Sequence, residues 1–252
     1  MVTRKSRREI DKMRTAGRIV AEVLALVESE LKPGVSTAHL DRLAERHIRS
    51  SGAVPSFKGY GHRSNPFQAS LCISIDDEVV HGIPGERQIR DGQIVSVDAG
   101  AIYDGWHGDG ARTFIVGQPP SEVVELIDTT RMAMMAGIAA AVPDANLGDI
   151  SGAIEDVAGS GGYGIVRQFV GHGIGTEMHQ EPQVPNYRAG PRGLELAPGI
   201  CLAIEPMLTL GGDEVSIKPD GWTVVTRDGS LAAHFEHTIA VTEHGPEILT
   251  TT

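Results

Sequence analysis

The stretch SVDAGAIYDGWHGDG, residues 96–110, predicts a β-hairpin that carries two acidic side chains on one face. The Asp-Gly pair at 104–105 favours a two-residue turn, and strand side chains alternate between faces. With the turn at 104–105, Asp98 lies diagonally from Asp109. With the turn at 103–104, the two acids lie directly opposite. Both registers place the carboxylates roughly 5–8 Å apart, where like charges repel.

The residues before the hairpin indicate that these acids are buried. Asp98 follows the segment IVSV (94–97), which places valines on the face opposite to the acid and makes the strand at least half buried. An unpaired buried carboxylate is costly. A solvated face is therefore excluded, and a proton shared by the acids or a cation between them remains.

Composition places the chain among globular proteins. Its 252 residues are 40% hydrophobic, enough for a large α/β domain or two fused halves, and its net charge of −11 offers no broad cationic surface for nucleic acid or anionic lipid. No apolar run is long enough to span a membrane, and the charged N-terminus is not a signal peptide. The basic cluster RKSRR (4–8) is predicted to be a solvated helix start. Buried thiols at Cys72 and Cys201 indicate a cytoplasmic protein.

A helix–helix–strand pattern occurs twice along the chain. A capping box formed by Ser6 and Glu9 opens the first long helix, and apolar residues then recur at helical spacing. Pro33 maps onto Pro143 and Leu40 onto Ile150 with one shift of 110 residues. The four predicted helices run from Ser6 to the LKPG segment, from Ser36 or Thr37 to residues 50–52, from Ser121 to the AVPD segment, and over NLGDISGAIEDVAG (146–159).

The strands repeat as well. HGIP at 81–84 resembles HGIG at 172–175, and DGQIVSVD at 91–98 resembles PGICLAIE at 198–205. Each half then continues to one further acid. The acids matched in this way are Asp98 with Glu205, followed by Asp109 and Glu236.

This partial repeat predicts a single domain, residues 1–252, built from two pseudo-symmetric halves. The halves cover about 6–118 and 121–249, while residues 176–197 have no counterpart. The fold class is α+β, and the sheets of the two halves are expected to meet where the acids meet.

Five side chains are predicted to converge on one metal site. Four carboxylates and one imidazole are too negative to share a pocket without cations, and this donor set suits two divalent ions bridged by carboxylates. No Cys-x-x-Cys or Cys/His cluster indicates a structural zinc site. The predicted ligands are Asp98, Asp109, His172, Glu205 and Glu236.

The ordered motifs HGIP, SVDAGAIYDGWHGD, GHGIGTEMHQEP, AIEP and FEHTIAV closely resemble those of type I methionine aminopeptidases. The resemblance covers residues from about 6 to about 249. It implies the pita-bread (creatinase/aminopeptidase) fold with a curved antiparallel sheet. It also implies a metalloprotease that removes the initiator methionine from nascent proteins through a hydroxide activated by two metal ions. Cobalt, manganese and iron are all compatible with the ligand set.

The resemblance also implies a role for each ligand. Asp98 holds one metal ion, His172 and Glu205 hold the other, and Asp109 and Glu236 bridge both. Glu205 is in addition the expected proton carrier, which takes the proton of the water and delivers it to the leaving amine. A free α-amino group that ligates one metal would restrict cleavage to the first peptide bond.

Two histidines and an apolar pocket complete the implied site. His81 contacts the substrate amide, and His179 stabilises the tetrahedral intermediate. Many relatives carry Phe in place of the methionine at position 178, and segment 59–72 is longer than usual. Plain core packing is an equal interpretation for the cysteine of the pocket. The expected substrate-binding residues are Phe57, Tyr60, Cys72, Met178 and Trp222, with His81 and His179.

Two alternatives come from the same fold and one from another class. Xaa-Pro aminopeptidases and prolidases share the five ligands but carry an additional N-terminal domain, for which the helix at residue 6 leaves no room. Type II methionine aminopeptidases carry a helical insertion before the last ligand, whereas only 30 residues separate Glu205 from Glu236 here, which favours type I. A non-catalytic binding module would typically lose ligands. We therefore expect a monomer without an N-terminal extension, which acts near the ribosome on N-termini with a small second residue and binds no nucleic acid or membrane.

Overall fold

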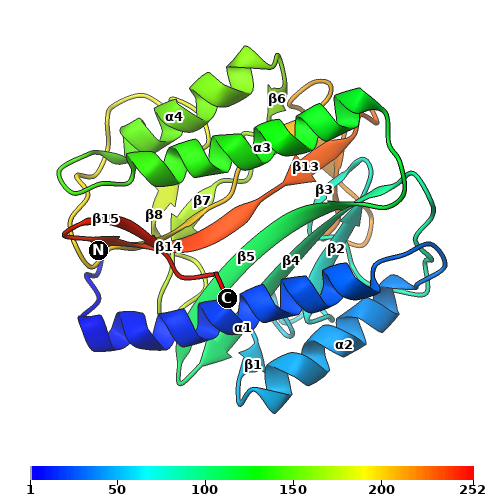
Figure 1. Ribbon diagram of the computed structural model, residues 1–252, viewed down its shortest axis with the longest axis horizontal. Helices are drawn as coiled ribbons and strands as arrows, with labels where there is room; N and C mark the ends of the chain where they lie inside the picture. Colours follow the sequence, from blue (N-terminus) through cyan, green and yellow to red (C-terminus); the bar gives the residue numbers. More distant parts are fainter. Residues whose placement is uncertain (1) are drawn as a thin grey trace.

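The computed structural model describes residues 2–252, and the described chain contains four α-helices. Their bounds are α1 (Arg7–Glu30), α2 (Thr37–Ser50), α3 (Ser121–Ala140) and α4 (Leu147–Ser160). The two short helices, α2 and α4, have 14 residues each and follow the predicted shift at both ends. Figure 1 shows the pair α1/α2 in blue and the pair α3/α4 in green on opposite sides of the strands.

The predicted start of α1 is confirmed, but the prediction that its basic residues are solvated is wrong for Lys5. Ser6 is the N-cap, and its amide donates to Glu9 Oε2 at 2.7 Å, as a capping box requires. Arg7 and Arg8 are exposed, as expected for a solvated helix start. Lys5 is buried instead, because its amine turns inward and donates to Gln180 Oε1 at 3.4 Å. This contact links the start of α1 to the second half of the chain.

The strands form one large sheet and two small ones. Their bounds are β1 (Val54–Pro55), β2 (Leu71–Ile75), β3 (Glu78–Val80), β4 (Ile94–Tyr103), β5 (Trp106–Ile115), β6 (Gly164–Ile165), β7 (Gly171–Gly173), β8 (Gln180–Val184), β9 (Cys201–Ile204), β10 (Met207–Thr209), β11 (Val215–Ile217), β12 (Val224–Thr226), β13 (Ala232–His234), β14 (Glu236–Thr242) and β15 (Gly245–Ile248). The small sheets have the orders β13-β10-β6 and β11-β12-β3.

The large sheet runs through both halves of the molecule. Its order is β1-β4-β5-β14-β9-β7-β8, with β2 beside β4 and β15 beside β14, and its pairings are antiparallel. The first half ends at β5 and the second half continues from β14, so the β5–β14 pairing is the seam between them (Figure 1). A site built on this seam receives side chains from both halves.

The hairpin β4–β5 uses the first of the two predicted registers. Tyr103 pairs with Trp106, so Asp104 and Gly105 are the turn residues. Both have positive φ, 47° and 81°, as a two-residue turn of this kind requires. Gly100 therefore pairs with Asp109.

Each helix pair packs its own apolar core against the sheet. Around α1 and α2, the buried side chains include Val23, Leu40 and Val97. Around α3 and α4, a separate cluster includes Leu126 and Ile150. Burying each such side chain contributes roughly 1.5–3 kcal/mol, so both cores stabilise the sheet that carries the predicted ligands. Between Val2 and Thr252, no helix combines the length and the apolar character needed to cross a membrane.

Candidate metal centre

The strand pairing places three of the predicted ligands on one face of the sheet beside the seam. Asp98 of β4 pairs with Ala111 of β5, and Ala111 pairs with Glu236 of β14. Residues paired across strands share a face, and so do residues two apart along a strand. Asp109 lies two residues from Ala111 and therefore faces the same side. Ala111, with its small side chain, lies between Asp98 and Glu236 on this face.

The second half brings its two remaining ligands to the same face. Thr238, two residues beyond Glu236, pairs with Ala203 of β9, and Ala203 pairs with His172 of β7. Glu205 lies two residues beyond Ala203 and immediately follows β9. All five predicted ligands therefore project from one face. The second half supplies three of them, each from a separate segment.

Three of the five predicted ligands form a tight group, and all five are largely shielded from solvent. Asp109, His172 and Glu236 each offer one ligand atom, and these atoms all lie within 4.8 Å of one another. Asp98 is buried as well, and the side chain of Glu205 is 12% exposed. The Oε1 atom of Glu205 lies 3.4 Å from Nε2 of His172.

Two buried carboxylate oxygens of this cluster lack hydrogen-bond partners. Within residues 2–252, Asp98 Oδ1 and Glu236 Oε1 accept no hydrogen bond. Burial, followed by the neighbouring carboxylates, raises the pKa of Asp109, Glu205 and Glu236, and burial raises the pKa of Asp98. Unpartnered oxygens and mutual repulsion are what a divalent cation would relieve, so the donor set fits a metal centre.

The imidazole of His172 is oriented toward the acids. Its Nδ1 lies 3.0 Å from the carbonyl oxygen of Gly173. A carbonyl only accepts, so Nδ1 donates and Nε2 keeps its lone pair toward Glu205. Burial, and then the nearby His179, lower the pKa of His172 to about 3. The ring is therefore neutral, which is the form that binds a metal ion.

The two predicted non-ligand histidines lie at the mouth of the cluster. Tyr60 and His179 form a hydrogen bond there, with 2.7 Å between the phenol oxygen and Nδ1. The centroid of the His179 ring lies 4.2 Å from that of the His172 ring. His81 has a φ of 61°, unusual for a non-glycine residue, and such backbone clusters at functional sites. Burial, and then His179, lower the pKa of His81 to about 4.

A single cavity contains the metal cluster, since all five predicted ligands line it together with a set of apolar side chains. It measures about 100 Å³, and its walls combine the predicted residues with two others. Since roughly 10–15 Å³ on this measure holds one water, the cavity has room for a few small groups, and this space is shared between the metal cluster and its apolar part. Away from the metal ligands, its walls include Phe57, Tyr60, Phe67, Cys72, Met178 and Trp222.

Sequence reasoning did not single out three residues of this region. Phe67 is buried and packs edge-on against Phe57 and Trp222. Val80 lines the cavity next to the strained histidine that follows it. His234 is buried with Nε2 3.9 Å from Glu205 Oε2. Phe67 stands inside the segment predicted to form the wall, whereas nothing local to the other two indicated their place.

Comparison with known proteins gives concordant results over the whole chain. The profile of metallopeptidase family M24 matches residues 11–243. A methionine aminopeptidase of Clostridium acetobutylicum is 51% identical over 251 residues, which is 99% of each chain. The crystal structure of methionine aminopeptidase from Thermotoga maritima superimposes with a TM-score of 0.96 at 42% identity, covering 100% of both chains.

A more distant likeness concerns the fold alone. Prolidase from Pyrococcus furiosus has a TM-score of 0.78 at 22% identity, covering 99% of this chain and 65% of that one. The predicted pita-bread fold is thus confirmed by structures of both kinds.

Proposed function

The chain belongs to metallopeptidase family M24, and we propose that its two halves hold two divalent metal ions between them. Its activity is that of a methionine aminopeptidase, which removes the N-terminal methionine from nascent proteins and peptides. We further propose that residues 1–252 act as a single catalytic domain with halves at about 6–118 and 121–249. The observation that carries the metal assignment is the convergence of five ligand side chains from both halves on one face.

The proposed ligand scheme divides the five residues by position. Asp98 would hold one ion, His172 and Glu205 the other, and Asp109 and Glu236 both. The unpartnered oxygens of Asp98 and Glu236 and the free Nε2 of His172 support this division. When bound, divalent ions of this kind act as Lewis acids and lower the pKa of water toward neutrality. Cobalt, manganese and iron suit the donor set equally, and availability decides between them.

Glu205 is the proposed proton carrier. Its carboxylate is largely shielded from solvent beside His172, and burial raises its pKa above the ordinary value of a glutamate. A raised pKa suits a group that accepts a proton from the attacking water and later releases it to the leaving amine. His234, with Nε2 3.9 Å from Oε2, faces the oxygen that does not lie toward His172.

The two histidines are assigned to the substrate. With the Tyr60 hydroxyl donating to Nδ1 of His179, the proton of this neutral ring resides on Nε2, which becomes a donor for the developing oxyanion. His81 would contact the substrate amide. Its neighbours Phe169 and Trp222 meet its ring edge-on at 5.5 and 6.1 Å between centroids, which restricts its orientation.

The apolar part of the cavity is the proposed site of the methionine side chain. Phe57, Phe67 and Cys72 from the first half face Met178 and Trp222 from the second half. A wall of aromatic rings and thioether or thiol groups suits a long unbranched side chain that contains sulfur. We also propose that the natural substrates are nascent chains with a small second residue. The enzyme would act on them as a monomer in the cytoplasm, near the ribosome.

One experiment separates this function from its alternatives. The purified chain is stripped of metal, reloaded with cobalt, manganese or iron separately, and assayed on Met-Ala-Ser and on an Xaa-Pro peptide. We expect metal-dependent release of methionine from Met-Ala-Ser. Faster cleavage of the Xaa-Pro peptide would instead identify a prolidase-like enzyme, and no cleavage of either peptide with any metal would indicate a binding module.

A further inference from the structure

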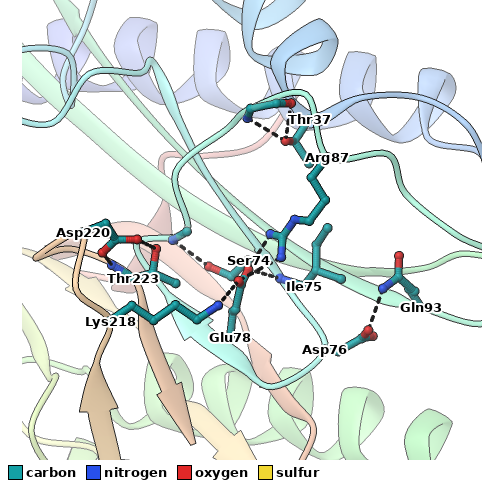
Figure 2. A network of polar contacts seen from close by, with 12 residues as sticks. Thr37, Ser74, Ile75, Asp76, Glu78, Arg87, Gln93, Lys218, Asp220 and Thr223 are labelled. Atoms are coloured by element: carbon teal, nitrogen blue, oxygen red, sulfur yellow. Dashed lines mark hydrogen bonds and ion pairs between the residues drawn. The ribbon is translucent and has the colours of Figure 1, made fainter.

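Glu78 is a buried carboxylate that the proposed chemistry does not use. It begins β3, a short strand that leads to His81, and its side chain is 4% exposed. Arg87 donates to both oxygens at 2.9 and 2.6 Å, and Lys218 Nζ donates to Oε1 at 2.7 Å. The amide of Ile75 donates to Oε2 at 2.9 Å. Figure 2 shows these donors converging on the carboxylate from different segments.

The two cations belong to two loops that carry pocket residues. Arg87 follows His81 along the chain, and Lys218 opens the turn that presents Trp222. The Lys218 amide donates to the carbonyl of Thr223 at 2.8 Å, which closes that turn. One carboxylate therefore joins the loop of His81 to the turn of Trp222, and these two rings meet at the cavity.

Further contacts hold the loop from His81 to Arg87 at both of its ends. The Gly82 amide donates to Ser74 Oγ at 3.1 Å, directly after the strained His81. The carbonyl of Arg87 accepts from the Thr37 amide at 3.0 Å, which anchors the far end of the same loop to α2. A strained backbone persists only when its surroundings over-determine it, and these contacts do so.

A side-chain turn in the Lys218 loop orients the indole. Asp220 Oδ1 accepts from the Trp222 amide at 2.8 Å, and the indole Nε1 donates to the carbonyl of Asn65 at 3.1 Å. Asn65 in turn donates to the carbonyl of Asp220 at 3.0 Å. The position of Trp222 thus depends on where the turn is held. The pairing of Val224 with Val80 holds the end of the turn, and Lys218 holds its start through Glu78.

Glu78 is ionised in this environment. Burial raises its pKa, but the hydrogen bonds from Arg87, Lys218 and Ile75 outweigh burial, and the pKa lies below the ordinary value. Removing the charge while keeping the size of the side chain leaves two cations with no reason to converge, because each is 40–45% exposed and can turn to solvent.

We propose that Glu78 is a positioning residue, which fixes His81 and Trp222 at the mouth of the cavity by binding Arg87 and Lys218 together. The proposal rests on the proposed function of that cavity as the methionine site. It assigns Glu78 no contact with the substrate or the metal ions.

The first test reads the position of Trp222 without any turnover. Trp106 is replaced by Phe, so that Trp222 is the only tryptophan, and Glu78→Gln is added. We expect a shift of the emission maximum and greater quenching by acrylamide. Glu214→Gln is the matched control, since Glu214 pairs with Arg227 at 3.1 Å beside the same hairpin but is 73% exposed. It should leave the emission unchanged.

The second test reads the reaction on Met-Ala-Ser with the metal-loaded chain. Glu78→Gln should lower kcat/KM about ten- to a hundredfold, mainly through KM, because small misplacements of positioning groups have effects of this size. Bound metal should stay unchanged. Lys218→Met should reproduce the emission change with a smaller kinetic effect, and it replaces Glu78→Gln if that variant does not fold.

Unchanged Trp222 emission and unchanged KM in the folded variants would overturn the proposal. So would a lower unfolding temperature with normal kinetics, which would make Glu78 merely structural. If the wild-type chain releases no methionine, the proposed function fails, whereas the emission experiment still decides the role of Glu78.

Discussion

The two halves of the molecule deliver their metal ligands in different ways. The first half presents Asp98 and Asp109 from one continuous hairpin, β4–β5, whose register follows from a two-residue turn. The second half presents His172, Glu205 and Glu236 from three segments that are far apart along the chain. The second helix of each pair, in contrast, has the same length of 14 residues in both halves.

This difference shows which contacts define the site. Local turn chemistry positions the acids of the first half, whereas those of the second half depend on the long-range order β14-β9-β7. The two bridging candidates, Asp109 and Glu236, lie on either side of the β5–β14 seam. Any change that disturbs the seam should therefore affect the site more than a change within one half.

The largest expected effect is the loss of a bridge. Asp109→Ala removes the acid that the first half contributes to both ions, and we expect kcat/KM on Met-Ala-Ser to fall at least ~10³-fold, beyond the 10–100-fold typical of outer-shell changes. Steady-state kinetics at saturating metal measure this. Asp104→Asn in the turn of the same hairpin is the control, because Asp104 is exposed and pairs with Lys12. Near wild-type activity of Asp109→Ala would refute the ligand scheme.

The next largest effect concerns the hydrogen bond between Tyr60 and His179, which connects the two halves next to the metal cluster. His179→Ala should lower kcat about 10²–10³-fold, as loss of an oxyanion donor does. Tyr60→Phe should lower it roughly two- to tenfold, the equivalent of one hydrogen bond. In the double variant the Tyr60 effect should vanish, since it acts through His179. Additive effects in this cycle would show that Tyr60 has a role of its own.

A smaller effect tests the seam itself. Thr238 Oγ1 accepts from the Asp109 amide at 2.9 Å and donates to the Asp109 carbonyl at 2.8 Å. Thr238→Val leaves both groups buried without partners, so we expect about 1–3 kcal/mol lower unfolding free energy. Metal affinity, measured by titration calorimetry, should fall roughly 10–100-fold. Thr242→Val, at the outer end of the same strand, should leave metal affinity unchanged; equal losses in both variants would contradict a special role of the seam.

The smallest effect is a difference in pH dependence. The folded-state pKa of Glu78 lies below the ordinary value, so its stabilising contribution is complete above that value and is lost as the pH falls through the folded pKa. At neutral pH, the Glu78→Gln variant should therefore have a lower unfolding temperature than the wild-type chain. On acidification, the unfolding temperature of the variant should fall less than that of the wild-type chain. Parallel curves of unfolding temperature against pH below about 5 would exclude this linkage.

Much of the first half was predictable because its signals are local. The capping box at Ser6, the Asp-Gly turn and the alternation around Asp98 specify α1 and the hairpin without reference to distant residues. Only the choice between two registers stayed open, since adjacent turn positions are both compatible with the sequence. The pairing of Tyr103 with Trp106 settles it.

The second half needed a different source of information. The identity of its ligands followed from the internal repeat and the family motifs rather than from any local pattern. His234 and the inward turn of Lys5 were not predictable, because each depends on a partner from a distant segment, Glu205 and Gln180. Buried polar residues of this kind carry no periodic signal.

Anomalous diffraction from crystals of the manganese-loaded chain would show whether the two halves share one pair of metal ions. We expect two anomalous peaks, each within bonding distance of ligands from both halves, with Asp109 and Glu236 touching both. A single peak bound by one half alone, or two peaks that share no ligand, would show that the halves do not share a metal pair.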